Sequence, residues 1–267
     1  MQKKTKAEGK CLFCGKTFTK AGINRHLATH LQEKTEKGKT GKSFFVKVEP
    51  DKSLEYLPYF LSLLIDGETK MENFDSFLRN IWLECCGHQS VFRDPLMAEE
   101  GGGMCEAIAM GAYDFLENGQ VAEHERIMED CMGEIPKSRK TKEVLEKGLV
   151  LEYEYDFGST TDLSITVIDE YPIKADKKVV LLSRNEPLEI MCSICGKAPA
   201  TQVCSVCIWD AEDALFCDKC AKKHARKCED FADSAVLPVV NSPRMGVCTY
   251  EGGAIDTERD EVFIPKE

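Results

Sequence analysis

Apolar and polar residues alternate along the chain in ways that predict both strands and helices. Strand-like composition or alternation occurs at 44–48, 149–157, 163–169 and 179–182. Helix-like spacing or helix start and stop residues occur at 73–86, 106–118, 121–131 and 141–148. Pro58 argues against a long helix within the apolar stretch 54–65. Because the predicted strands and helices follow one another irregularly, we predict an α+β fold rather than a doubly wound sheet.

Composition divides the chain into five segments. Residues 1–32 hold a compact Cys/His element with a basic arm, and 33–42 are rich in Lys, Gly, Thr and Glu, which predicts a flexible linker. Residues 43–190 contain the predicted α+β domain, and 191–230 are dense in cysteine. Residues 231–267 form a C-terminal tail with few signs of regular structure.

Charge is distributed unevenly. Residues 1–47 carry twelve Lys or Arg and three Asp or Glu, a balance of +9, whereas the rest of the chain carries −20 within a net charge of −11. A basic arm on an acidic body indicates contact with a polyanion, with an acidic protein, or between the two parts. No apolar run reaches the ~18 to 20 residues that cross a bilayer, and the basic N-terminus lacks an apolar stretch. We therefore expect no membrane contact, no signal peptide and a cytoplasmic location.

The N-terminal segment has the ligand spacing of a zinc site. Two residues separate Cys11 from Cys14, eleven residues follow, and His26 and His30 stand one helical turn apart. Two thiolates on a turn and two imidazoles on one helix face suit tetrahedral zinc. The segment resembles the two-Cys, two-His zinc finger, with one residue fewer than usual between the second Cys and the first His. Zinc would supply the folding free energy, because so short a segment buries too little apolar surface alone.

This finger is a candidate for nucleic-acid contact. In the usual register its base-contacting positions are Thr19, Gly22 and Arg25, and only Arg25 offers a bidentate contact to guanine. One finger covers about three base pairs, so we expect non-specific phosphate binding. The candidate phosphate-contacting residues are Lys10, Lys16, Lys20 and Arg25. A protein-binding finger is the alternative.

The C-terminal module contains four pairs of metal-ligand type, at a spacing typical of structural zinc. The eight candidate ligands are Cys192, Cys195, Cys204, Cys207, Cys217, Cys220, His224 and Cys228. Four protein ligands on each zinc leave no open position for water, which predicts structural rather than catalytic sites. The pattern resembles the cross-braced B-box and MYND modules, and this resemblance implies that the first and third pairs share one zinc and the second and fourth share the other. Sequential pairing remains an alternative.

The middle of the chain offers weaker candidates. Cys85, Cys86 and His88 form either a ligand cluster or a reactive thiol site, although Cys85 continues the apolar face of a predicted helix, which favours a buried structural role. Cys105, Cys131 and Cys248 have no partner motif. Tyr153, Tyr155 and Phe157 would share one sheet face, where core packing is the expected role rather than base stacking.

The segment Tyr153-Glu-Tyr-Asp-Phe-Gly158 looks like the signature of the plasmid pRiA4b ORF-3-like family. An opening strand at 44–48 and the Gly87-His88-x3-Phe92 region agree with that resemblance, which covers roughly residues 43–190. The family often continues with Asp-x-Trp-x-His after this Phe-Gly, whereas Ser159 and the residues after it differ here. The resemblance implies a compact α+β domain with a curved sheet and assigns no activity.

Together these features favour a zinc-binding protein that is not an enzyme, with three Zn²⁺ per chain. A mobile basic finger would contact nucleic acid or a ribonucleoprotein, and the C-terminal module would dock a protein. The first alternative is a protein–protein interaction adaptor that binds an acidic partner. The second is an enzyme that uses Cys85, Cys86 and His88 or carboxylates of the central domain.

Overall fold

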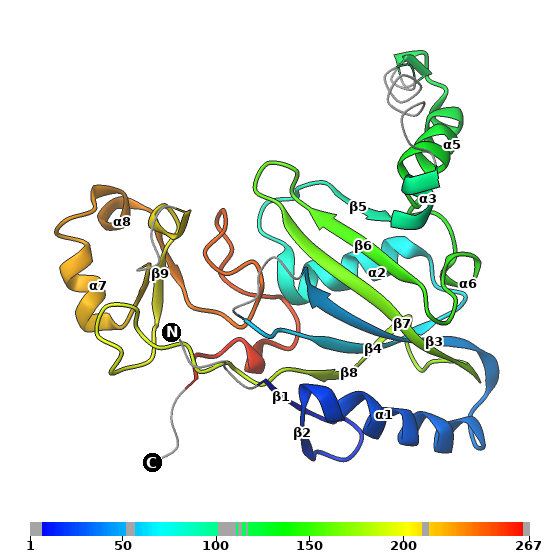
Figure 1. The fold of residues 1–267 in the computed structure, drawn as a ribbon, viewed down its shortest axis with the longest axis horizontal. Helices are drawn as coiled ribbons and strands as arrows, with labels where there is room; N and C mark the ends of the chain where they lie inside the picture. The colour runs from blue at the N-terminus through cyan, green and yellow to red at the C-terminus, as the bar shows by residue number, and fades with distance from the viewer. Residues whose placement is uncertain are drawn as a thin grey trace.

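The computed structural model describes residues 7–51, 57–100, 111, 114–115, 117–209 and 214–263. In the described chain, the centre is a six-stranded antiparallel sheet in the order β5-β6-β7-β3-β4-β8 (Figure 1). Its strands are β3 (Thr40–Pro50), β4 (Leu61–Asp66), β5 (Ser90–Arg93), β6 (Val150–Tyr155), β7 (Thr161–Ile173) and β8 (Val179–Arg184). The predicted α+β class is confirmed, and each of the four predicted strands lies in this sheet.

The sheet is covered on both faces near its middle. Helix α1 (Lys20–Thr35) lies on one face, where Ser62 of β4 donates a hydrogen bond to Asn24 at 2.8 Å. The opposite face holds the aromatic core beneath α2 (Met71–Leu78), where Phe74 stacks on Phe92 of β5 at 5.5 Å. Because both its faces are covered, β4 is buried throughout and lacks the alternation that identifies a half-exposed strand.

The predicted helix at 73–86 changes form and ends early. Helix α2 continues as a π-helical turn, η1 (Arg79–Leu83), which buries Ile81 and Trp82. The backbone is then extended at Glu84, with ψ at 123°. Cys85 therefore does not continue a helix face, and that part of the prediction was wrong. Apolar spacing reported the buried face correctly but did not show where the helix would stop.

The N-terminal finger is part of the central domain rather than a mobile attachment. Strands β1 (Glu8–Lys10) and β2 (Thr17–Thr19) form a hairpin. The backbone N–H of Leu12 donates to the carbonyl of Leu182 in β8 at 2.9 Å, and Lys20 pairs with Glu49 at 2.7 Å. Three α1 residues, Ile23, Leu27 and Leu31, are completely buried.

The segment predicted as a flexible linker, 33–42, is mostly regular structure. Helix α1 continues to Thr35 and β3 begins at Thr40, so only 36–39 lie between them. The correction has a tertiary cause, because the start of β3 pairs with the end of β7, with Thr40 opposite Ile173. The polar composition of this segment gives no indication of that distant partner.

The cysteine-dense module has a small core of its own. A three-stranded antiparallel sheet has the order β10-β9-β11. The strands are β9 (Gln202–Cys204), β10 (Leu215–Phe216) and β11 (Val236–Pro238), and the helical elements are η2 (Cys207–Trp209), α7 (Asp218–His224) and α8 (Glu229–Asp233). Figure 1 shows this module beside the central sheet, with α7 at its outer edge.

The C-terminal tail packs on the central domain. Ser242 donates a hydrogen bond to the Trp82 carbonyl at 2.7 Å, and Tyr250 is completely buried. Arg184 of β8 is also completely buried and pairs with Asp256 and Asp260 of the tail. The first residues of the predicted tail belong instead to the cysteine-dense module, through the end of α8 and β11. After β11 the described tail includes the short η3 (Thr257–Arg259) and otherwise has little regular structure, which is why its pattern of residues indicated no packing.

The remaining helices lie along one side of the molecule. They are α3 (Pro95–Glu100), α5 (Val121–Met132) and α6 (Thr141–Val144). Helix α5 confirms the prediction at 121–131, whereas α6 is shorter than the predicted 141–148 because Leu145 has an extended backbone. The predicted helix at 106–118 lies mostly outside the described residues. Among the described helices, none has the length and apolar character of a membrane span.

Candidate metal centres

Within the described part of the chain, four groups of Cys and His side chains each bring four donor atoms to within 4.8 Å of one another. A zinc tetrahedron has Zn–S bonds of about 2.3 Å and Zn–N bonds of about 2.1 Å, so its sulfurs lie about 3.8 Å apart and its sulfur–nitrogen pairs about 3.6 Å apart. The cysteines in these groups are all free thiols. Three groups contain the twelve predicted ligands, and the fourth joins the weaker candidates Cys85, Cys86 and His88 to Cys248.

The finger group comprises Cys11, Cys14, His26 and His30. The sulfur of Cys14 lies 3.2 Å from Nε2 of His26, and the two Nε2 atoms lie 3.2 Å apart. The hairpin supplies the two thiols, with Gly15 at φ 74° where the chain turns after Cys14. Burial, followed by the nearby His30 and Lys16, lowers the pKa of His26 and so favours the neutral imidazole that binds metal.

The proposed nucleic-acid contacts of the finger fall into two classes. Lys10, Lys16 and Arg25 are exposed. Lys20 is instead held against the central domain, where its ammonium pairs with Glu49 and donates to the Tyr59 carbonyl at 3.4 Å. Burial alone would raise the pKa of Glu49, but hydrogen bonds from Lys20 and Lys47 outweigh this and lower it. The ammonium of Lys20 is therefore already paired within the molecule and is not placed to contact a phosphate.

The first C-terminal group comprises Cys192, Cys195, Cys217 and Cys220. The sulfurs of Cys195 and Cys217 are 3.9 Å apart, close to the tetrahedral value. Burial opposes ionisation of Cys192, but backbone N–H groups outweigh it and lower the pKa to about 6. Burial and the neighbouring thiols raise the pKa of Cys220 to about 12. Without a cation, one thiol of this group ionises readily, but further thiols resist ionisation because the negative charges would repel one another. A bound divalent ion would offset that repulsion.

The second C-terminal group comprises Cys204, Cys207, His224 and Cys228. The sulfur of Cys207 lies 3.7 Å from Nε2 of His224 and 3.9 Å from the sulfur of Cys228. Phe216 stacks on the His224 ring at 4.3 Å and fixes its orientation. Burial, then Lys227, lowers the pKa of His224 and favours the neutral ring.

The ligand pairs of this module are interleaved. The first pair joins the third, at the start of α7, and the second pair joins the fourth, at the end of α7. The sequence left sequential pairing open, and the structure excludes it. Each group provides four protein donors, which leaves no position for substrate water, so the geometry suits structural zinc.

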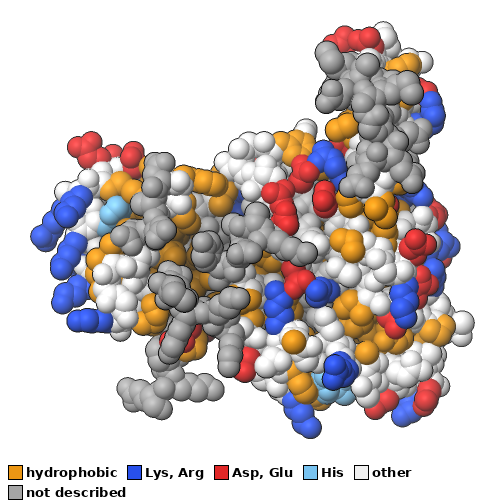
Figure 2. All heavy atoms as spheres, in the orientation of Figure 1, with side chains coloured by type: hydrophobic (Ala, Val, Ile, Leu, Met, Phe, Trp, Pro, Cys, Tyr) orange, Lys and Arg blue, Asp and Glu red, His pale blue; other side chains and the backbone are white. Residues whose placement is uncertain are grey.

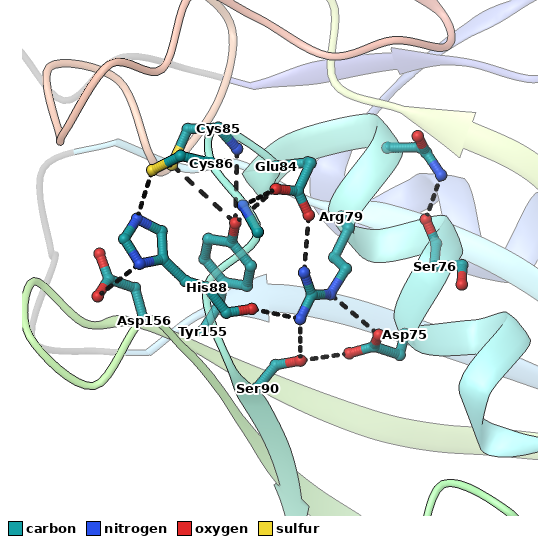
Figure 3. A network of polar contacts seen from close by, with 12 residues as sticks. Asp75, Ser76, Arg79, Glu84, Cys85, Cys86, His88, Ser90, Tyr155 and Asp156 are labelled. Atoms are coloured by element: carbon teal, nitrogen blue, oxygen red, sulfur yellow. Dashed lines mark hydrogen bonds and ion pairs between the residues drawn. The ribbon is translucent and has the colours of Figure 1, made fainter.

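The fourth group comprises Cys85, Cys86, His88 and Cys248. The first three residues lie in the turn after η1, and Cys248 reaches them from the C-terminal tail (Figure 3 shows the turn). A hydrogen bond to His88 lowers the pKa of Cys248 to about 6, whereas the neighbouring Cys248 and then burial raise that of Cys86 to about 12. This group therefore has the same uneven thiol acidity as the first C-terminal group.

A polar network supports the turn that carries these thiols. The guanidinium of Arg79 donates to Asp75 at 3.0 Å and to Glu84 at 2.7 Å (Figure 3). Tyr155 donates to Glu84 at 3.1 Å and accepts a hydrogen bond from the backbone N–H of Cys85 at 3.4 Å. Burial would raise the pKa of Glu84, but Arg79 outweighs it and keeps the carboxyl ionised.

The predicted aromatic row divides between core and surface. Tyr153 and Tyr155 are completely buried, as expected for core packing, whereas Phe157 lies beyond the end of β6 and is 53% exposed. Sequence analysis missed Cys248 as a member of a ligand group. The motif Cys85-Cys86-x-His88 indicated a set of donors, but it gave no indication of which distant residue would complete it.

Comparison with known proteins does not assign this chain to a family. No family model matches it, and no curated protein matches it significantly. Among solved structures, MM3350 from Methanosarcina mazei Go1, a protein of unknown function, aligns with a TM-score of 0.35 and 9% identity over 54% of this chain and 68% of that chain. A similarity this low carries no functional argument, and the resemblance to the pRiA4b ORF-3-like family stays a prediction.

Proposed function

We propose that this is a zinc-stabilised binding protein, rather than an enzyme, that contacts nucleic acid or a ribonucleoprotein through cationic surfaces on its two zinc modules. The Cys/His groups support a structural role for the metal, because each provides four protein donors. Three Zn²⁺ ions would then hold the finger and the C-terminal module in shape. The contacting groups are the exposed cations that these modules carry.

A row of exposed cations on the C-terminal module is the observation that carries this proposal. Along and just beyond α7, in order, are Lys219, Lys222, Lys223, Arg226 and Lys227, all exposed. In the described part of the chain, none of them has an ion-pair partner. Figure 2 shows basic side chains gathered along this outer edge, on a protein whose net charge is −11. A single-sign row of this kind on an acidic protein is suited to a phosphate backbone.

The metal groups determine which way this row points. Cys220 and His224 are ligand-type residues of α7 that face the module's interior. Residues 219, 222, 223 and 226 are spaced by three or four positions, so they share the opposite, outward face of the helix and the turn after it. Loss of the metal would therefore disperse the row as well as unfold the module.

The finger contributes a smaller cationic group. Lys10, Lys16 and Arg25 are exposed and belong to the proposal, whereas Lys20 does not because it pairs with Glu49. Since the finger packs on the central sheet, deletion of the N-terminus would damage the fold. Charge reversal at exposed positions is the appropriate test.

The test measures how binding of labelled single-stranded RNA and double-stranded DNA depends on salt, by fluorescence anisotropy. The variant Lys222→Glu/Lys223→Glu removes two candidate phosphate contacts and should reduce the slope of log K against log [salt] by about 1.8 for duplex DNA. A second variant, Lys16→Glu, tests the finger. The matched control is Lys174→Glu/Lys177→Glu, at exposed positions between β7 and β8. Unchanged affinity and slope in the α7 variant would contradict the proposal.

A protein-interaction adaptor is a second candidate, favoured by a different observation. Four large apolar side chains are exposed on the described part of the C-terminal module, namely Ile194 at 55%, Val206 at 43%, Trp209 at 62% and Val236 at 43%. Exposed apolar groups on zinc-binding turns suit a protein partner. The two candidates separate in a pull-down with nuclease treatment. Capture that survives nuclease and is lost on Trp209→Ser favours the adaptor, whereas capture lost on nuclease treatment favours nucleic acid.

A further inference from the structure

The donor atoms of the fourth group lie close enough together to share one tetrahedral metal ion. The sulfur of Cys86 lies 3.7 Å from that of Cys85 and 3.5 Å from that of Cys248. Nε2 of His88 lies 3.6 Å from the sulfur of Cys248 and 2.9 Å from that of Cys86. Three of these four separations, at 3.5–3.7 Å, lie close to the tetrahedral expectation of about 3.6–3.8 Å. The fourth, between Nε2 of His88 and the sulfur of Cys86, is shorter. A disulfide between Cys86 and Cys248 would need sulfurs about 2.05 Å apart and would leave His88 without a role.

The histidine of the group has the outer partner that a metal-binding imidazole usually has. Nε2 of His88 faces the sulfurs, while Nδ1 lies 3.4 Å from a carboxylate oxygen of Asp156 (Figure 3). This arrangement orients the ring and fixes the proton on the nitrogen away from the metal. The carboxylate of Asp156 accepts hydrogen bonds from the guanidinium of Arg244 at 2.6 Å and from the backbone N–H of Gly158 at 3.1 Å.

A buried cation lies beside one of the three thiols. The guanidinium of Arg244 is completely buried and lies 3.6 Å from the sulfur of Cys85. Zinc with three thiolates and one neutral imidazole carries a net charge of −1. Arg244, which also pairs with Asp156, places positive charge beside that complex. Arg244 also donates to Thr161 and to the Ser159 carbonyl, both at 3.0 Å, and these contacts fix its position.

The backbone is held in an unfavourable conformation at two positions of this site. Among the described residues, three that are not glycine have positive φ, and two of these belong to the group or its partner, with Asp156 at 67° and Cys248 at 54°. Left-handed backbone costs free energy for residues other than glycine and tends to occur at functional sites. Here it directs the carboxylate of Asp156 towards His88 and the sulfur of Cys248 towards the turn.

From these observations we infer that Cys85, Cys86, His88 and Cys248 bind a fourth Zn²⁺ ion, which fastens the C-terminal tail to the central domain. Three sulfurs and one imidazole nitrogen are a donor set that Zn²⁺ prefers. On binding, the thiols that are still protonated release their protons to solvent. The ion would join residues 160 positions apart in the sequence, and Cys248 is the one member of the group that the tail provides. The inference does not depend on the nucleic-acid contact proposed above.

Native mass spectrometry of the full chain, purified with zinc and without chelator, tests the site by counting bound ions. We expect four Zn²⁺ in the wild type and three in Cys248→Ser. Two substitutions of His88 make a matched pair. His88→Phe should bind three Zn²⁺, whereas His88→Cys, which supplies a fourth donor atom again, should bind four. His124→Phe, at a histidine outside the four groups, is the matched control for His88→Phe and should bind four.

The outcomes separate this site from the other three. Three Zn²⁺ in the wild type, or four in both Cys248→Ser and His88→Phe, would overturn the fourth site while leaving the other centres intact. If Cys248→Ser fails to fold, the His88 pair still decides the question. Co²⁺ reconstitution gives an independent measurement, because sulfur-to-cobalt charge-transfer absorption per protein should fall in Cys248→Ser. Unchanged absorption would count against the site.

Discussion

Replacing Arg184 with methionine should destabilise the protein strongly, because this arginine anchors the C-terminal tail. Its side chain is completely buried, donates to the Asn241 carbonyl and pairs with Asp256 and Asp260. Methionine keeps much of the apolar stem but removes the charge and every donor. Each of the two carboxylate side chains is 11% exposed. Asp260 would then lack a buried cation, whereas Asp256 would keep its pairing with Arg259.

The expected cost follows from that uncompensated charge. Removing one partner of a buried ion pair costs about 3–5 kcal/mol, a large part of the ~5–15 kcal/mol that holds a typical domain folded. At about 2–4 °C per kcal/mol for a chain of this size, the melting temperature should fall by roughly 6–20 °C. Burial already raises the pKa of Asp256 despite the nearby arginines. Losing Arg184 raises that pKa further, so the penalty should shrink as the pH falls and Asp256 becomes protonated.

Urea unfolding with zinc in excess, followed by tryptophan emission, measures this effect, because Trp82 is completely buried beside the tail. The control is Arg226→Met, at an exposed arginine after α7, which should change the free energy of unfolding by less than about 0.5 kcal/mol. A loss below about 1 kcal/mol for Arg184→Met would refute the reasoning. The tail would then be held by its apolar contacts rather than by this buried cation.

Three further changes test other parts of the structure. Gly9→Ala should lower the melting temperature and loosen the finger, because the new Cβ would lie 2.5 Å from a buried aromatic ring and 3.1 Å from a backbone oxygen of β8; an unchanged melting curve would contradict this close packing. Hydrogen bonds from Lys140 and Lys142 lower the pKa of Glu68 to about 2. The ionised Glu68 therefore stabilises the folded protein fully above its unfolded-state pKa of about 4.3, and this stabilisation is lost as the pH falls towards 2. The difference in unfolding free energy between the wild type and Glu68→Gln should shrink over that range and not widen. Cys217→Ser should cost one C-terminal zinc, counted by native mass spectrometry, and leave the finger's zinc in place.

Local spacing was sufficient to identify most of the candidate ligands. Pairs separated by two residues, such as Cys192 and Cys195, place both sulfurs on one turn whatever the rest of the chain does. His26 and His30 stand one helical turn apart and lie on one helix face for the same local reason. Strands with clear alternation, such as β6, were also predictable, because one face is buried and the other is not.

The tertiary structure decided what depends on distant segments. No local pattern shows that β3 pairs with β7, so the polar composition of 33–42 predicts a flexible linker where the structure has the end of a helix and the start of a strand. Whether Cys192 shares an ion with Cys207 or with Cys217 depends on how α7 packs, because each pair alone supplies only half a tetrahedron. Cys248 joins Cys86 only because a tail with little regular structure folds back over the central domain. Ligand pairs follow from local geometry, and complete sites follow from packing, since four donors must meet at a single point.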